Sequence, residues 1–185
     1  MNRKEWNKLI RAGKTKGIES LHNTADMLGK LDLADVKVFS FSFQKNGISN
    51  NDKITSLIEK ENLPNKGKWV YAFCAENPSK LLKQFRDKKD KEKGKKFAQA
   101  NDKVDKPSCV YVGSSNDKLK TRMAQHFGKA PVGTYAIRFN EWLPGGEEIT
   151  CFYFEVQTQS RDVLQALENG LWDNLKPIIG KRGGK

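Results

Sequence analysis

Two segments far apart in the chain most constrain its fold, because each places a tyrosine within a short apolar pattern typical of a β-strand. They are Trp69-Val70-Tyr71 and Tyr111-Val112-Gly113. The second opens onto a basic helical pattern that ends Arg122-Met123-Ala124-Gln125-His126. Arg122 and His126 are four residues apart and therefore share one face of that helix. This combination of side chains near strand and helix ends points to phosphodiester chemistry.

The helix that carries Arg122 and His126 needs a residue that caps its first turn. Ser115 or Asn116 can do this, since each has a side-chain oxygen that accepts from free backbone N–H groups. Either cap would place Arg122 and His126 close to the end of the strand that carries Tyr111.

In this order the residues resemble a GIY-YIG nuclease domain, over about residues 68–182. Val70-Tyr71 stands where that family has the end of GIY, and Tyr111-Val112-Gly113 stands where it has YIG. Arg122 and His126 match the arginine and histidine of the family's helix.

The last predicted helix extends the resemblance. Glu168 is similar to the metal-binding glutamate of the family, and Lys176-Pro177 is similar to its downstream Lys-Pro. The chain departs from the family at Trp69 and Val70, which replace glycine and isoleucine, and at Gly180, where many members place an asparagine. Tyr71 and Tyr111 are also separated by a lysine-rich insert, at about residues 79–106, as in some restriction enzymes of the family.

The expected fold class is α+β, with a small antiparallel β-sheet flanked by helices, as the resemblance also implies. The period-two and helical patterns place strands at about 69–75, 108–113 and 134–142 and helices at 117–127 and 162–175. A further strand at 149–156 can extend the sheet, and Pro144-Gly145-Gly146 suits a hairpin turn before it. Ser160 or Asp162 is expected to cap the last helix.

Residues 1–62 are predicted to form an N-terminal elaboration, mostly helical with one strand, ahead of a nuclease-like domain over 68–182. Helical spacings cover 2–33 but are broken at Gly13 and Gly17, which predicts two helices. Alternation from Val36 to Phe43 predicts a strand, and residues 54–61 predict a short helix.

The composition favours a nucleic-acid partner. The 185 residues contain 34 Lys and Arg against 22 Asp and Glu, a formal charge of +12, which attracts polyanions. No apolar run approaches the length of a membrane span, and the first residues lack the apolar run of a secretory signal, so a cytoplasmic protein is expected. The three cysteines lie in apolar patterns and are predicted to be buried thiols: Cys74, Cys109 and Cys151.

The resemblance implies catalysis by Tyr71, Tyr111, Arg122, His126 and Glu168. Glu168 would hold Mg²⁺, or Mn²⁺ in its place, because one carboxylate with waters and phosphate oxygens is a common Mg²⁺ site. One tyrosine would take a proton from the attacking water, and the resemblance leaves open which; with a pKa of about 10 it needs nearby positive charge. Arg122 would bind a phosphate oxygen, and His126 would relay a proton or contact phosphate.

Each of these residues also has an ordinary structural interpretation. The tyrosines can be half-buried strand aromatics, and Arg122 a solvated helix arginine. His126 can lie at a helix C-terminus because a positive charge is favourable there, and Glu168 can lie near the start of a helix because a negative charge is favourable there. Only their joint occurrence in the family's order favours the catalytic interpretation.

Two basic segments are candidate DNA contacts. Residues 80–106 contain eleven Lys or Arg and five Asp or Glu, and the C-terminal tail is basic and glycine-rich. The insert can clamp phosphates beside the cut, or it can be a solvated helix or a mobile loop. The tail can contact phosphates through Lys181 and Arg182 or be a frayed terminus. The expected contacts are Lys88, Lys89, Lys95, Lys96, Lys176, Lys181 and Arg182.

The expected function is therefore a divalent-metal-dependent DNA endonuclease, of restriction type given the insert, for which a dimer can serve to cut both strands. The alternative, motivated by Gly180 and the basic charge, is a nucleic-acid-binding module that keeps this scaffold but has lost catalysis. An RNA-binding protein of unrelated fold is disfavoured, because the sequence has no aromatic-rich RNA-binding signature.

Overall fold

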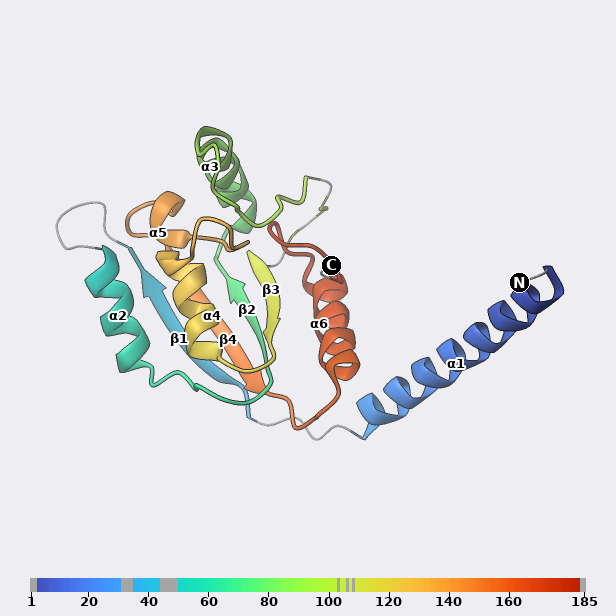
Figure 1. Ribbon diagram of the computed structural model, residues 1–185. Helices are drawn as coiled ribbons and strands as arrows, with labels where there is room; N and C mark the ends of the chain where they lie inside the picture. The colour runs from blue at the N-terminus through green and yellow to red at the C-terminus, as the bar shows by residue number, and fades with distance from the viewer. Residues whose placement is uncertain are drawn as a thin grey trace.

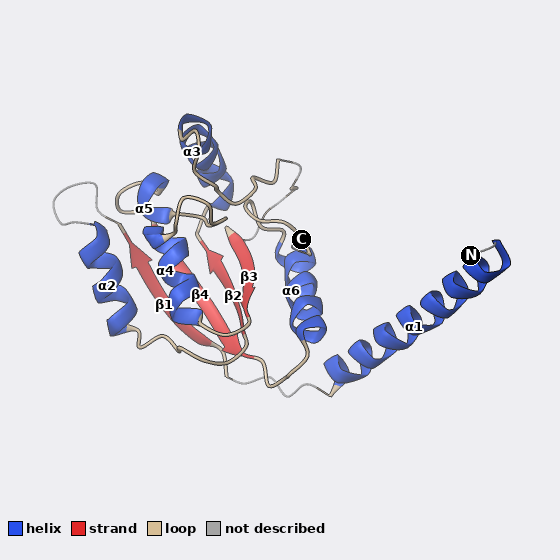
Figure 2. Cartoon of the chain, viewed as in Figure 1, coloured by secondary structure: helices blue, strands red, loops and turns tan. Residues whose placement is uncertain are grey.

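The computed structural model describes residues 3–30, 35–43, 50–102, 104–105, 107 and 109–183. Its centre is a four-stranded antiparallel sheet in the order β1-β4-β2-β3 (Figures 1 and 2). The helices lie on both sides of this sheet and at its end, so the α+β fold class expected from the sequence is confirmed. The strands are β1 Lys37–Ser42, β2 Trp69–Cys74, β3 Tyr111–Ser115 and β4 Glu148–Glu155.

One face of the sheet carries the main hydrophobic core, because strand residues alternate between the two faces. Phe41 of β1 is surrounded by other rings, with centroid distances of 4.8 Å to Phe127, 5.4 Å to Phe139 and 6.0 Å to Phe73. The helical elements on this face are α2 Asn50–Lys60, α4 Leu119–Ala124, the π-helical turn Gln125–Lys129 and α5 Phe139–Trp142.

The opposite face is covered by α6, Arg161–Leu175, which packs on β2 and β3. Its first turn is capped by Ser160, whose Oγ accepts from the Val163 N–H at 3.3 Å. Ser160 was one of the two caps that the sequence allowed. The helix ends where Lys176 adopts a left-handed conformation ahead of Pro177, so the chain turns back toward the sheet.

The N-terminal region contributes an edge strand to the same sheet. β1 pairs with β4, with Phe39 opposite Cys151, and α2 packs against α4. The strand predicted over 36–43 and the helix over 54–61 are therefore present. In contrast, α1, Arg3–Gly29, extends away from the sheet, contacts α6, and keeps nearly all its described side chains in solvent (Figure 1).

Three expectations about the elements were wrong. The described part of the 2–33 segment, residues 3–30, contains one helix and not two. A glycine in a helix interior costs only about 1 kcal/mol, and Gly13 and Gly17 are both helical. The strand predicted over 134–142, and with it the hairpin to 149–156, is absent, because β4 already has β1 and β2 on its two sides and Arg138 is left-handed. The strand predicted over 108–113 is Tyr111–Ser115, and residue 108 lies outside the described residues.

The helix predicted in the insert is α3, Pro78–Lys91, which lies at the end of the sheet and contacts α5 (Figure 1). Cys109 and Cys151 are buried as expected, whereas Cys74 is half-buried. No helix in the described ranges is both long and apolar enough to cross a membrane.

Because Phe41 anchors β1 in the aromatic core, Phe41→Ala should lower the free energy of unfolding by about 3–5 kcal/mol. Val38 lies on the same strand but is 55% exposed, so Val38→Ala should change it by less than about 0.5 kcal/mol. Urea denaturation of the two variants measures both values. Equal, small losses would mean that β1 is not part of the folding core.

Candidate active site

The two tyrosines of the sequence motif lie side by side on the α4 face of the sheet. Tyr71 on β2 pairs with Gly113 on β3, and Tyr111 lies two residues before Gly113, so both rings project from the same face. Their centroids are 6.2 Å apart with the planes inclined by 24°. A Cβ on Gly113 would lie 2.5 Å from Tyr111 Cε1 and 2.8 Å from the Tyr71 hydroxyl. The glycine of the motif is therefore required for the two rings to approach each other.

The helix after β3 brings Arg122 and His126 over these rings. It starts at Leu119 with Lys118 as N-cap and no side-chain cap, so the expected cap by Ser115 or Asn116 was wrong. Ser115 is instead the last residue of β3, paired with Trp69. After Ala124 the helix widens into a π-helical turn, a feature frequent at functional sites, and His126 lies within it.

Three side chains form a hydrogen-bonded cluster around the Tyr71 oxygen. His126 Nε2 is 2.8 Å from Tyr71 Oη, and Arg122 Nε donates to the same oxygen at 3.3 Å. The backbone N–H of Ile137 donates to His126 Nδ1 at 3.3 Å, so Nδ1 must be an acceptor. In a neutral imidazole the proton is then on Nε2, which donates to Tyr71. Two N–H groups therefore converge on one phenol oxygen.

The charges in this cluster follow from its burial. Burial, with the Arg122 charge, lowers the pKa of His126 well below its usual value, so the ring is neutral at physiological pH. Burial raises the pKa of Tyr71 well above 10 and also raises that of Tyr111, and Arg122 only partly opposes this. Burial alone would lower the pKa of Arg122, but the two tyrosines outweigh it and the guanidinium stays charged. Both tyrosines consequently carry their protons when no ligand is bound.

Glu168 lies on α6, on the face of the edge strand β3 that is opposite to the two tyrosine rings. Its Oε2 accepts from Ser114 Oγ at 2.5 Å, and Ser114 directly follows Gly113. Burial raises the pKa of Glu168, while Ser114 and the positive Arg122 lower it. The carboxylate in turn raises the pKa of both tyrosines, so it lies within electrostatic reach of them. Tyr71, Tyr111, Arg122 and His126 thus form one cluster on the α4 face of the sheet. Glu168 lies on the α6 face, behind β3, and interacts with that cluster electrostatically.

Gly180 lies against the ring of Tyr111. Its φ is +107°, and a Cβ there would lie 2.9 Å from Tyr111 Cε2. An asparagine at this position would therefore strain the backbone and push the Tyr111 ring aside. Its N–H donates to the Gln99 carbonyl at 2.7 Å. In the resemblance described above, this glycine stands where many members of that family place an asparagine. Its role, like that of Ser114, depends on packing between distant segments and has no local sequence signal.

Several of the basic residues expected to contact DNA are paired with acids. Lys88 and Lys95 both contact Glu92, at 2.6 and 3.2 Å, and Lys95 also contacts Glu141 at 3.0 Å. In the tail, Arg182 forms a forked pair with Asp173, at 2.6 and 2.8 Å. The remaining candidates differ in exposure: Lys96, Lys176 and Lys181 are exposed and Lys89 is half-buried.

The oxygen donors at this edge suit a hard cation. Glu168 offers a carboxylate and Ser114 a hydroxyl, and Mg²⁺ is commonly held by one or two carboxylates while it keeps several waters. Over the described residues, no group of three or more His, Cys, Asp or Glu side chains gathers to hold a metal. A site of this kind would therefore be sparse and completed by substrate oxygens.

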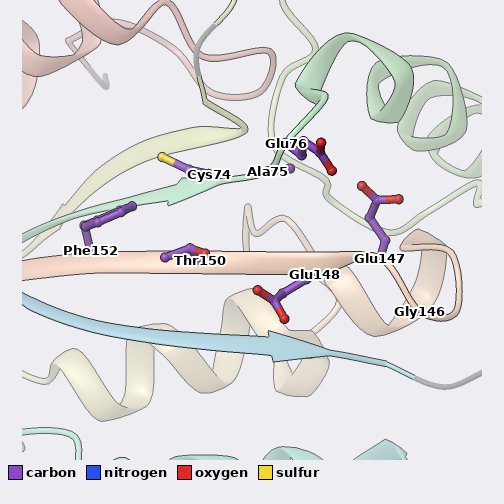
Figure 3. A pocket seen from close by; sticks show the side chains of 8 residues that line it. All are labelled: Cys74, Ala75, Glu76, Gly146, Glu147, Glu148, Thr150 and Phe152. Atoms are coloured by element: carbon purple, nitrogen blue, oxygen red, sulfur yellow. The ribbon is translucent and has the colours of Figure 1, made fainter.

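A surface hollow lies elsewhere, beside the ends of β2 and β4, and it is acidic. Figure 3 shows the carboxylates of Glu76 and Glu147 pointing toward one another, with Glu148 beneath them. Three carboxylates repel phosphate, so this hollow does not suit a nucleic acid. The cluster around Tyr71 remains the candidate active site.

No protein-family model, curated protein or solved structure matches the chain.

The burial of neutral His126 predicts a pH-dependent stability. An unfolded histidine gains a proton below about pH 6.5, whereas buried His126 does not, so the unfolded state binds more protons there. The free energy of unfolding should therefore fall as the pH decreases below about 6.5, by at most about 1.4 kcal/mol per pH unit. Urea denaturation between about pH 7.5 and 5 measures this fall.

His126→Gln is the matched variant, since it removes the titrating ring but keeps a polar side chain. Its unfolding free energy should depend less steeply on pH than that of the wild type. The raised pKa of Glu168 acts in the opposite direction but is present in both proteins, and His22, the other histidine, is exposed on α1. Identical slopes in the two proteins would contradict a buried neutral His126.

Proposed function

We propose that this protein is a divalent-metal-dependent endonuclease that hydrolyses phosphodiester bonds in DNA. The observation that supports it most directly is the convergence of His126 and Arg122 on the oxygen of Tyr71, with Tyr111 stacked beside it. Glu168 is bonded to Ser114 on the other face of β3, and its charge acts on both tyrosines. Phosphodiester hydrolysis needs a proton acceptor for water, positive charge for the phosphate oxygens and help for the leaving oxygen. This cluster contains a group for each requirement.

Arg122 supplies the permanent positive charge. It is half-buried and held by Gln125 and by the Tyr135 carbonyl as well as by Tyr71, so its guanidinium is fixed in place. A fixed guanidinium binds phosphate oxygens with little further loss of side-chain freedom. Its charge also opposes the raised pKa of the tyrosines.

The tyrosine pair is the proposed proton acceptor. The rings of Tyr71 and Tyr111 are stacked with their centroids 6.2 Å apart, and each affects the pKa of the other. Tyr71 is 1% exposed and forms the inner end, where the N–H groups of Arg122 and His126 would stabilise a phenolate. Tyr111 is half-buried as a residue and therefore more exposed than Tyr71, but its hydroxyl group is buried, which raises its pKa.

Glu168, with Ser114, would hold the metal ion. When bound, Mg²⁺ or Mn²⁺ supplies positive charge that stabilises the developing negative charge on phosphate and lowers the pKa of nearby acids. Ser114 orients the carboxylate, since its hydroxyl donates to Oε2, and the Gln165 side chain on the same helix also interacts with it.

DNA is the proposed partner because of the +12 charge, and the cytoplasm is the proposed location. A monomer could cut one strand, and a dimer would place two sites on a duplex.

The second candidate function is a module that binds nucleic acid without cutting it. The raised pKa of both tyrosines favours this alternative, since neither is an effective base until something lowers its pKa.

Incubation of the purified protein with supercoiled plasmid and Mg²⁺ should yield nicked or linear DNA. Glu168→Gln keeps the size of the side chain but removes the charge that holds the metal, so cleavage should fall by orders of magnitude. DNA affinity and thermal stability should change little. Gel electrophoresis and sequencing of the ends measure the outcome.

Glu76→Gln is the matched control, since Glu76 is exposed in the acidic hollow and should not affect cleavage. DNA binding by the wild type without any cleavage in Mg²⁺ or Mn²⁺ would favour the binding module. Undiminished cleavage by Glu168→Gln would place the nuclease site elsewhere.

The insert should contact phosphates mainly through Lys89 and Lys96, because Lys88 already contacts Glu92. Lys89→Ala and Lys96→Ala should each flatten the slope of log affinity against log salt concentration by about 0.9. Lys88→Ala should change that slope less. Fluorescence anisotropy titrations at several salt concentrations measure it, and unchanged slopes in all three variants would mean that the insert is a solvated helix.

A further inference from the structure

The loop before α5 presents an exposed aromatic ring next to the candidate active site. Tyr135 is 63% exposed, and Val132, on the same loop, is 58% exposed. The other large apolar side chains with high exposure, among the described residues, lie on α1, on β4 or near β1. An exposed apolar pair beside a polar catalytic cluster is a candidate substrate contact.

The backbone of this loop is bound to the cluster itself. Arg122 Nη1 donates to the Tyr135 carbonyl at 3.1 Å, and the Ile137 N–H donates to His126 Nδ1 at 3.3 Å. Two residues of the proposed catalytic set therefore fix the segment that carries Tyr135. The position of the ring relative to a bound phosphate is set by the same hydrogen bonds that orient Arg122 and His126.

The loop is also held from its other side, by Lys96 of the insert and by Arg138, the residue before α5. The Lys96 N–H donates to the Val132 carbonyl at 2.9 Å. Arg138 is 2% exposed and donates to the carbonyls of Ala130 at 2.9 Å and Pro131 at 2.6 Å. A buried guanidinium that donates hydrogen bonds to two backbone carbonyls holds the loop in one conformation. The fold therefore keeps Tyr135 at the surface.

The Tyr135 ring already has a cation on one side. Lys96 Nζ lies 5.2 Å from its centroid, within the range of a cation–π contact. Lys96 itself is exposed and can reach a phosphate while it covers the ring. A nucleotide offers the two partners that such a pair accepts, a flat base for the ring and a phosphate for the ammonium group.

We propose that Tyr135 stacks on an unpaired base of the nucleic acid, next to the phosphate bound by Arg122. In an intact duplex both faces of each internal base are covered by its neighbours, so a ring on a loop can stack only on a base that is unpaired or at an end. The preferred substrate is therefore DNA with an unpaired segment, such as a fork or an overhang. This inference rests on the proposed function but is tested by binding alone.

The experiment uses the full chain without divalent metal, so that no cleavage takes place. Fluorescence anisotropy is recorded with three labelled probes that carry the same number of phosphates: a blunt duplex, a fork with unpaired arms, and the same fork with abasic sites in its arms. The wild type should bind the fork more tightly than the other two probes. The abasic fork keeps the charge and removes only the bases.

Tyr135→Ala should weaken binding to the fork by about ten-fold and leave binding to the blunt duplex and the abasic fork nearly unchanged. Tyr135→Phe keeps the ring and should bind the fork like the wild type. Phe152→Ala is the control, because Phe152 is also an exposed aromatic, 40% exposed, but lies on the opposite face of the sheet. It should bind all three probes like the wild type.

Equal weakening of all three probes by Tyr135→Ala would mean that the ring contacts the sugar–phosphate backbone, which overturns base stacking. If Tyr135→Ala bound the fork as tightly as the wild type does, base stacking would be overturned as well. Binding of the blunt duplex by the wild type would in that case still agree with the proposed function. Failure of the wild type to bind any probe would overturn both the inference and the proposed function.

Discussion

The contact between the rings of Tyr71 and Tyr111 is the constraint on which the candidate site depends. It requires two neighbouring antiparallel strands in a register that puts Gly113 opposite Tyr71, and a glycine at that position, since a Cβ would overlap both rings. It also requires Gly180 behind the Tyr111 ring. A sequence that keeps the tyrosines without these glycines could not place both hydroxyls under one helix.

Burial of this polar cluster has a cost that the surrounding core must offset. His126 is fully buried, and a neutral imidazole is stable there only because both ring nitrogens have partners, Ile137 on one side and Tyr71 on the other. The aromatic core built around Phe73 and Phe127 lies directly against it, with a 5.7 Å distance between the Phe73 and His126 rings. Stability and site geometry therefore share the same rings.

Much of this arrangement could be predicted from the sequence, because it depends on local patterns. The strand around Tyr71, the helix carrying Arg122 and the capped helix carrying Glu168 each have an apolar period that identifies them. The segment around Ile137 was predicted wrongly as a strand because its residues alternate. Its expected hairpin partner, β4, is already paired with β1 on one side and with β2 on the other. Strand order depends on the whole chain and cannot be predicted from a short stretch of sequence.

The parts of the site that could not be predicted are those made by distant segments. Ser114 follows the YIG-like motif, yet its bond to Glu168 joins residues 54 positions apart. The exposure of Tyr135 likewise depends on hydrogen bonds from Arg122 and on the buried Arg138, which no periodicity reveals. These contacts arise only after the sheet, α4 and α6 have packed.

The placement of charge favours approach of a phosphate at the β3 side of the sheet. The carboxylates of Glu76, Glu147 and Glu148 gather around the hollow of Figure 3, whose strand residues Cys74, Thr150 and Phe152 are on the face of the sheet opposite to the tyrosine rings. In the insert, Glu92 holds Lys88 and Lys95, which leaves Lys96 beside Tyr135. Under the proposed function, a polyanion would be repelled from the hollow and attracted toward Lys96 and Arg122. The +12 charge of the chain would bring nucleic acid to the protein, and this local distribution would orient it over the tyrosine pair.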